Sequence, residues 1–299
     1  RTAASWAMWN SQVAFRSDSH VLTDLVDSLQ VLLKTHEGVN GFHLGTTNQR
    51  HTHSWVRDNY LIQRGLLAGG HLEEAKKNLD AFYSCWKESG VAIGYHVFSR
   101  RPWAPRPTAE LYSYLILMVR DVYRWVGDAD FSQNYWPMIE ECAEKLSTNR
   151  AGLTGFDGDE IWYWELDQAS LWEHVREERP TLDQASVLDN CWLAIAALDY
   201  AAEVARHRKD DDRSLSWAAK RDGIFQSVDA RMWAAETGAY HSLLMPDGTP
   251  YHSPFVNGLC TPLYWGVDET RPGSFSAGVR RCWKELRTSE GIVRGNACT

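Results

Sequence analysis

Apolar residues recur at intervals of three and four along most of the chain, the spacing that places them on one face of an α-helix. The first such run begins at Ser19 and stops before Gly38. Residues 1–18 have no clean period, so we interpret them as a lead-in segment. The apolar positions of the first run are Val21, Leu22, Leu25, Leu29, Leu32 and Leu33. This run predicts a helix.

The helical runs that follow come in pairs joined by short turns. Ser54 is a suitable N-cap for a helix that continues to Gly69–Gly70, and a second helix is predicted over residues 73–86. Two helices joined by so few residues should pack antiparallel. The pattern predicts two further pairs, 108–125 with 131–146 (after Asp130 as N-cap) and 182–206 with 214–233.

Each pair combines an apolar helix with a more charged one. The second helices carry charged residues such as Lys76, Lys77, Lys220 and Arg221. This alternation favours an inner ring of helices wrapped by an outer ring, a helical toroid. A short β-hairpin is predicted within residues 238–256, and the last clear helix spans 276–286.

The loops before the first helix of each pair are long and rich in Trp, His, Arg and acids, whereas the turns inside the pairs are short. These loops should therefore open at one end of the toroid, where a pocket can form. Residues 155–166 (GFDGDEIWYWEL) hold four acids and three aromatics. A carboxyl held against indole rings has a raised pKa, which suits a general acid that protonates a glycosidic oxygen. The alternative is a solvated acidic loop beside an aromatic core stripe.

Composition narrows the function further. The chain of 299 residues has 44% hydrophobic and 23% charged residues, as expected of a soluble protein, and its apolar runs are shorter than the ~20 residues that cross a membrane. Its net charge of -8 without a basic stripe argues against a nucleic-acid partner. The 15 Trp residues suit a helical core, but those near acids in loops also suit the faces of sugar rings. A Gly-rich nucleotide loop is lacking, so no organic cofactor is predicted.

Six cysteines are widely spread and form neither a CxxC pattern nor a dense disulfide framework, which favours buried free thiols. The chain opens with Arg1 rather than Met, without a charged and then apolar leader. We therefore expect the native N-terminus, and any signal peptide with it, to be missing, and no compartment is assigned.

Three segments resemble the (α/α)6-barrel, or six-hairpin, glycosidases and glycoside phosphorylases: the glucoamylase, maltose-phosphorylase and debranching-glucosidase groups. Residues 51–79 (HTHSWVRDNYLIQRGLLAGGHLEEAKKNL) resemble their "W-x-RD … G … A" helical hairpin. Residues 109–146 resemble the next pair, with a "TGD"-like turn and "LWP". GDE at 158–160 with SVLDNCWLAIAALDYAA at 186–202 is similar to "GPDEY … DN … A", without its proline. The resemblance implies an all-α (α/α)6 toroid over residues 19–299, as one catalytic domain lacking its closing helices.

In the maltose-phosphorylase-like members the Glu of the DE pair is the general acid, which implies this role for Glu160. Rivals are Glu173, in a segment that resembles the LWE of glucoamylases, and Glu165. The resembled families mostly invert the anomeric centre, which requires a base late in the barrel. Glu290 and Glu269 are the late candidates, and surface acids near helix ends are the alternative for both.

Arg57 and Asp58 open an apolar helix, where they can be a solvated pair that interacts with the helix dipole. The resemblance instead implies that both hydrogen-bond sugar hydroxyls in a pocket. Trp55 would line the mouth of the same pocket. The other predicted substrate contacts are His53, Asp159, Trp103, Trp162, Trp164 and Trp172.

Two further clusters have competing interpretations. His51 and His53 form an H-x-H pair, but a third ligand at suitable spacing is lacking from this stretch, so no metal site is predicted. A basic-aromatic loop could bind phosphate, as a phosphorylase requires, or could pair with the acids of 155–166. It contains His96, Arg100, Arg101, Trp103 and Arg106.

The leading hypothesis is a glycoside hydrolase that inverts and removes a terminal sugar, α-glucose first, from an oligosaccharide. Hydrolysis is preferred to phosphorolysis because no convincing phosphate cradle is present. The alternatives are an inverting glycoside phosphorylase, a non-catalytic glycan-binding toroid, and a lyase or epimerase on the same barrel, which would depend on His or Tyr. The oligomeric state is left open.

Overall fold

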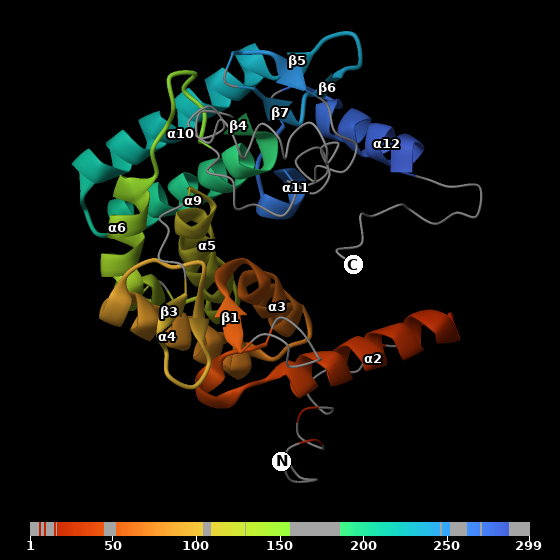
Figure 1. Cartoon of the computed structure of the whole chain (residues 1–299), viewed down its shortest axis with the longest axis vertical. Helices are drawn as coiled ribbons and strands as arrows, with labels where there is room; N and C mark the ends of the chain where they lie inside the picture. The colour runs from red at the N-terminus through yellow and green to blue at the C-terminus, as the bar shows by residue number, and fades with distance from the viewer. Residues whose placement is uncertain are drawn as a thin grey trace. The chain divides into compact units, whose positions relative to one another are not determined.

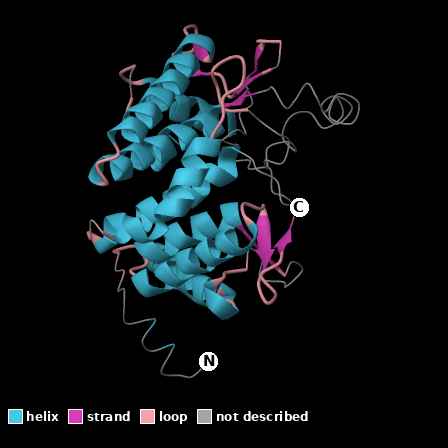
Figure 2. Cartoon of the chain, turned by 90° about the vertical axis from the view of Figure 1, so that its left-hand side faces the viewer, coloured by secondary structure: helices cyan, strands magenta, loops and turns pink. Residues whose placement is uncertain are grey.

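The computed structural model describes most of the chain: residues 6, 9, 15, 17–44, 52–103, 109–128, 130–155, 186–245, 247–251, 262–269 and 271–286. Helices make up most of this part, and its strands are two or three residues long (Figures 1 and 2). The chain forms two compact units. The first contains residues 1–107 and 114–142, and the second contains residues 108–113 and 143–299.

The first unit begins with helix α2 (His20–His36), followed by α3 (Val56–Ala68) and α4 (Leu72–Ser89). The first predicted helix is confirmed, and Ser19 is its N-cap, because its hydroxyl accepts a hydrogen bond from the Leu22 amide. The predicted cap at Ser54 is wrong. Ser54 lies in a strand, and α3 begins after Trp55, because the backbone there pairs with a neighbouring strand instead of turning into a helix.

The hairpin of α3 and α4 contributes buried side chains to the core of the first unit. Phe82 of α4 contacts the rings of Phe42 and Tyr95 edge-on, at centroid distances of 5.3 and 5.8 Å. A short 3₁₀ turn (Val39–Gly41) lies against α4. Gly41 is required there, because it has a φ of 85° and a Cβ would stand 2.4 Å from the Lys77 carbonyl oxygen.

Helix α5 (Ala109–Val126) supplies buried charge as well as apolar contacts. In the first unit, the Asp121 carboxylate accepts hydrogen bonds from the Tyr60 hydroxyl and the Arg120 Nε, both at 2.8 Å. The next predicted helix, 131–146, is observed as a 3₁₀ segment (Phe131–Tyr135) continued by α6 (Trp136–Lys145). Sequence periodicity alone cannot separate these two helix types when the first is one turn long.

Three short strands form an antiparallel sheet in the first unit: β1 (His53–Trp55), β2 (Gly94–His96) and β3 (Pro102–Trp103). In this register His53 lies opposite His96 and Trp55 opposite Gly94, which in turn lies opposite Trp103. The sequence did not predict this sheet. Strands of two or three residues are too short to show an alternating pattern.

Gly94 is the point at which the sheet is most tightly packed. A Cβ at this position would meet the Ser54 carbonyl oxygen at 2.9 Å and the Trp55 Cα at 3.2 Å, and both atoms belong to the backbone. We expect Gly94→Ala to lower the free energy of unfolding by about 1–3 kcal/mol, as overpacking does. Urea unfolding measures this change.

Gly223, inside helix α10 (Asp211–Arg231), is the matched control for that experiment, because a Cβ there meets no atom within 4 Å. Gly223→Ala should raise the free energy of unfolding by roughly 0.5–1 kcal/mol, since it removes a glycine from a helix interior. Equal effects of the two substitutions would contradict the packing argument for Gly94.

The core of the second unit is built on helices α9 (Leu188–His207) and α10 (Asp211–Arg231). α9 is buried along nearly its whole length, whereas α10 buries Trp217, Ile224 and Val228. The predicted contrast between an apolar and a charged helix is therefore confirmed for this pair. Trp192 of α9 contacts a set of three aromatic rings edge-on, those of Phe225, Tyr240 and Phe275.

The predicted start of this helix at residue 182 is wrong over its described part, because residues 186–187 form strand β4 (Ser186–Val187). β4 pairs with β7 (Leu243–Leu244), which pairs with β8 (Pro250–Tyr251). The predicted hairpin is thus confirmed. Gly248, with a φ of 86°, permits its turn.

The remaining elements of the second unit are short. Strands β5 (Trp233–Ala234) and β6 (Ala239–Tyr240) form a second hairpin. The chain continues through α11 (Pro262–Trp265) to α12 (Ser274–Leu286), which confirms the last predicted helix. Within the described part of the chain, the helices are too short or too polar to cross a membrane.

Two sequence predictions meet the fold outside these elements. Within the lead-in segment, Trp9 is buried, stacks on His71 and donates a hydrogen bond to the Gln30 carbonyl. Among the cysteines, the prediction of buried free thiols is confirmed for Cys85, Cys142 and Cys191. Cys260, Cys282 and Cys298 lie outside what the structure describes of side chains.

Candidate functional site

The sheet of the first unit carries aromatic rings on one face. Side chains alternate along a strand, so His53 and Trp55 share a face of β1, and Ser54 points to the other. The register brings His96 of β2 opposite His53 and places Gly94 between Trp55 and Trp103. Because Gly94 has no side chain, the two tryptophan rings can meet across the middle strand.

Direct ring contacts link these four side chains, with His53 contacting the other three. Trp55 and Trp103 meet edge-on with centroids 4.6 Å apart, and His53 lies 5.4 Å from Trp103 and 5.5 Å from His96. Trp103 is 45% exposed, so the cluster presents apolar surface to solvent. We call His53, Trp55, His96 and Trp103 the aromatic platform. An exposed aromatic surface of this kind can stack against the C–H face of a sugar ring.

Buried hydrogen bonds fix the opposite face of the same sheet. The Ser54 hydroxyl donates to the His43 carbonyl at 2.8 Å. Asn59 accepts a hydrogen bond from the His43 amide and donates to the carbonyls of His43 and Trp55, at 3.0 and 2.9 Å. The Tyr95 hydroxyl donates to the Gly90 carbonyl at 2.6 Å. These bonds hold β1 rigidly at the point where it enters α3.

Arg57 and Asp58 follow the platform directly, in the first turn of α3. The Val56 amide donates to the Ile93 carbonyl at 2.9 Å and ties the helix start to the sheet. Asp58 is half-buried, and burial raises its pKa above the usual range, although the Arg57 charge acts against the shift. A carboxylate kept partly away from water in this way can form strong hydrogen bonds with hydroxyl groups.

The structure therefore brings together part of the site predicted from the sequence. His53, Trp55 and Trp103 form one cluster, and Arg57 and Asp58 lie in the adjoining helical turn. The other predicted site residues lie outside the described residues: Asp159, Glu160, Trp162, Trp164, Trp172, Glu173 and Glu290. Glu165, Arg106 and His51 are also outside them.

The basic-aromatic loop does not form one group in its described part. His96 belongs to the aromatic platform, and its Nδ1 accepts a hydrogen bond from the Ser99 amide at 3.2 Å. Arg100 lies 3.5 Å from the Glu88 carboxylate. The described residues contain no group of three or more His, Cys, Asp or Glu side chains that could hold a metal ion.

Glu269, one of the two late acids considered as a base, has a structural role. Its carboxylate accepts hydrogen bonds from the amides of Gly273 and Phe275, at 2.8 and 2.6 Å, and from the Ser274 hydroxyl. These bonds lower its pKa, the Phe275 amide most strongly. Glu269 thus caps the start of α12, and three hydrogen bonds hold its carboxylate there.

The second unit contains a related strand–helix junction of its own. β4 runs into α9 as β1 runs into α3, and residues 56–59 and 187–190 share the pattern V-x-D-N. Asp189 is buried and accepts a hydrogen bond from the Trp265 indole at 2.9 Å. The repeated V-x-D-N is visible in the sequence and marks both junctions.

Solved structures share this fold. A GH78-family rhamnosidase of Bacillus sp. GL1 aligns over 92% of this chain and 29% of its own, with a TM-score of 0.67 and 14% identity. A glycosidase variant in complex with glucose aligns over 93% and 74%, with a TM-score of 0.65 and 12% identity. A rhamnosidase from Klebsiella oxytoca with rhamnose bound aligns over 93% and 50%, with a TM-score of 0.62 and 14% identity.

No protein-family model and no curated protein sequence matches the chain. At such low identities the structural similarity shows the fold alone. It confirms the predicted class, an all-α helical toroid with small β insertions. The chain spans less than a third of the Bacillus rhamnosidase and half of the Klebsiella one. The glucoamylase-like subtype and the presence of six helical hairpins stay predictions.

Proposed function

We propose that the protein is a glycoside hydrolase. The observation that carries this proposal is the aromatic platform joined to Asp58, a half-buried carboxylate with a raised pKa, at the start of α3. An apolar face beside a hydrogen-bonding carboxylate is the chemistry that recognises a sugar ring. The fold shared with glycosidases and rhamnosidases supports the same class.

In this proposal Glu160 protonates the glycosidic oxygen as the bond to the leaving group breaks. A second carboxylate, for which Glu290 is the remaining candidate, removes a proton from a water molecule that attacks the anomeric carbon from the opposite face, which inverts its configuration. Arg57 and Asp58 hold hydroxyls of the terminal sugar, and Trp55 with Trp103 forms one apolar wall. α-Glucosides are the first substrates to test, and α-rhamnosides the second because of the structural neighbours.

Product analysis tests the reaction class. The protein is incubated with aryl α-glucosides and α-rhamnosides, and proton NMR follows the first anomer released. We expect free sugar, with inverted configuration, at a rate that inorganic phosphate does not change. Release of sugar phosphate that depends on added phosphate would replace hydrolysis by phosphorolysis. Sugar binding without turnover of any glycoside would indicate a glycan-binding toroid.

The aromatic platform predicts a specific kinetic effect. We expect Trp103→Ala to raise KM by about 10-fold, because it removes apolar contact from the bound sugar. The substitution should change kcat little, since the contact is equally present in the ground state and the transition state. Steady-state kinetics on the best glycoside measure both parameters.

Trp125 provides the control, because it is a 53% exposed tryptophan on α5 outside the platform. Trp125→Ala should leave KM unchanged. If Trp103→Ala also left KM unchanged, the platform would not contact the substrate.

A further inference from the structure

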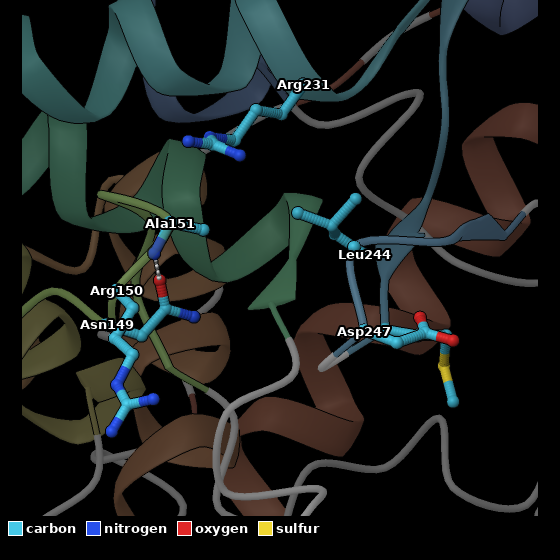
Figure 3. A pocket seen from close by; sticks show the side chains of 8 residues that line it. Asn149, Arg150, Ala151, Arg231, Leu244 and Asp247 are labelled. Carbon is cyan, nitrogen blue, oxygen red and sulfur yellow. Dashed lines mark hydrogen bonds between the residues drawn. The ribbon is translucent and has the colours of Figure 1, made fainter.

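The second unit contains a pocket with a volume of about 270 Å³. Its walls are the turn at Asn149–Ala151, the end of α10 at Arg231, and the β7–β8 hairpin from Leu244 to Gly248 (Figure 3). The volume lies just below the ~300 Å³ at which pockets for small molecules begin. The pocket therefore suits an occupant of one ring.

Asn149 gives the pocket a fixed wall. Its side-chain oxygen accepts hydrogen bonds from the amides of Ala151 and Leu153, at 2.9 and 3.3 Å. Its side-chain nitrogen donates to the Ser186 hydroxyl at 2.8 Å. Because the carboxamide is engaged in the turn, recognition of a ligand depends on the charged residues around it.

Charge is distributed unevenly around the pocket. Among the described residues, neither Arg150 nor Arg231 forms an ion pair, and both are exposed. The Arg231 guanidinium extends toward the side of Ala151, Asp247 lies on the other side, and Leu244 lies between them (Figure 3). Among the lining residues that the structure describes, two guanidinium groups against one carboxylate give a net positive charge, in a chain of net charge -8.

Asp247 stays ionised in this setting. The Thr249 amide donates to its carboxylate at 2.8 Å, and hydrogen bonds from Thr249 lower the Asp247 pKa. One side of the pocket thus offers hydrogen-bond donors with positive charge, and the other offers acceptors with negative charge. A ligand that carries both an anionic group and hydroxyl groups matches both sides.

One wall of the pocket is bonded to the described residues Gly155 and Ser186 through Asn149. The structure describes the chain up to Gly155 and again from Ser186. These two residues form a β-bridge with each other. Ser186 also accepts the hydrogen bond from Asn149 in the pocket wall. The pocket wall at Asn149 is therefore bonded to Ser186, which pairs with Gly155.

We propose that this pocket binds one acidic monosaccharide unit of the substrate, a hexuronate. Its carboxylate pairs with the Arg231 guanidinium group, its hydroxyls donate to Asp247, and its C–H face contacts Leu244. The inference rests on the proposed glycoside hydrolase function and narrows it to substrates that contain an acidic sugar.

Calorimetric titration of the full chain tests the pocket. The ligands are glucuronate and galacturonate, their neutral counterparts glucose and galactose, and inorganic phosphate. We expect a uronate to bind at least about 10-fold more tightly than its neutral counterpart, since a charge-assisted pair is lost in the latter. Arg231→Gln should weaken uronate binding by about 10-fold or more, and Arg231→Lys by less.

Arg280 is the matched control, because it is an exposed arginine of α12 outside the pocket. Arg280→Gln should bind uronate as the parent protein does, and thermal melts verify that every variant is folded. Equal affinity for uronate and neutral hexose would overturn the proposal. So would unchanged uronate binding in Arg231→Gln, or phosphate binding as tight as uronate with the same dependence on Arg231.

The two proposals fail separately in this design. Hydrolysis of neutral glycosides without any uronate binding would remove the acidic-sugar pocket and leave the hydrolase function in place. Uronate binding that depends on Arg231, without turnover of neutral or acidic glycosides, would support the pocket and remove the hydrolase function.

Discussion

Glu160→Gln is expected to abolish most turnover of glycosides with a poor leaving group and to leave sugar binding nearly intact. A glutamine cannot donate the proton that the departing oxygen needs, so kcat should fall by about 10²–10⁴-fold. The side chain keeps its size and its ability to hydrogen-bond, so the dissociation constant of a bound sugar should change little. Steady-state kinetics and calorimetric titration measure the two quantities.

A change of leaving group makes this test specific for acid catalysis. Fluoride and dinitrophenolate are leaving groups that depart from the sugar without protonation. The Glu160→Gln variant should therefore hydrolyse glycosyl fluorides and dinitrophenyl glycosides at close to the parent rate. Glu236→Gln is the control, because Glu236 is a glutamate with a 69% exposed side chain. Loss of activity on both classes of substrate would indicate a structural defect, and parental activity on both would remove Glu160 from the mechanism.

Glu173→Gln tests the rival acid in the same assay. If it reproduces the pattern expected for Glu160→Gln, namely loss on poor leaving groups alone, the role of general acid passes to Glu173. The two glutamates are thirteen positions apart in a segment that combines acids with tryptophans. Environment, rather than residue type, decides which of two such carboxyls stays protonated near neutral pH.

The helices were predictable because each depends on local features of the sequence. Apolar residues at helical spacing predicted α2, and the observed cap from the Ser19 hydroxyl to the Leu22 amide is equally local. The β7–β8 hairpin was equally local, since Asp247 and Gly248 form its turn. These interactions connect residues within a few positions of each other, so the sequence displays them directly.

The β1–β2–β3 sheet could not be predicted in this way. His53 pairs with His96 across more than forty positions, and each strand is too short for a period to be visible. The sheet in turn moved the start of α3 from Ser54 to the residue after Trp55. Tertiary pairing therefore overrode the local preference of serine for a helix cap.

The candidate site was predictable in its residue types more than in its arrangement. The family resemblance selected Trp55 and Asp58, and the structure joins them at the start of α3. His96 was grouped with neighbouring arginines as a candidate anion site, yet it packs against His53 because β2 lies between β1 and β3. The role of Gly94 could not be predicted from the sequence. It depends on the close approach of Ser54 and Trp55, which only the folded sheet brings about.

Asp58→Asn should lower activity and raise stability at the same time, because the Asp58 carboxylate serves substrate binding and destabilises the folded chain. We expect kcat/KM to fall by about 10²–10³-fold, because two charge-assisted hydrogen bonds to sugar hydroxyls are weakened. The free energy of unfolding should rise at the same time, by roughly 0.5–2 kcal/mol at neutral pH. Burial is the main cause of the raised pKa of Asp58, so its charged form is less favourable in the folded chain than in the unfolded chain.

The difference in the free energy of unfolding between this variant and the parent should depend on pH. A carboxyl with a raised pKa in the folded state favours folding while it is protonated, and this contribution is lost as the pH rises through that pKa. The variant should therefore exceed the parent in stability at neutral pH, and the difference should vanish as the pH falls through the titration range of Asp58. Urea unfolding of both proteins at several pH values measures the difference. A variant less stable than its parent at neutral pH would mean that attraction to Arg57 outweighs desolvation, and that Asp58 is a structural ion pair instead of a group held ready for substrate.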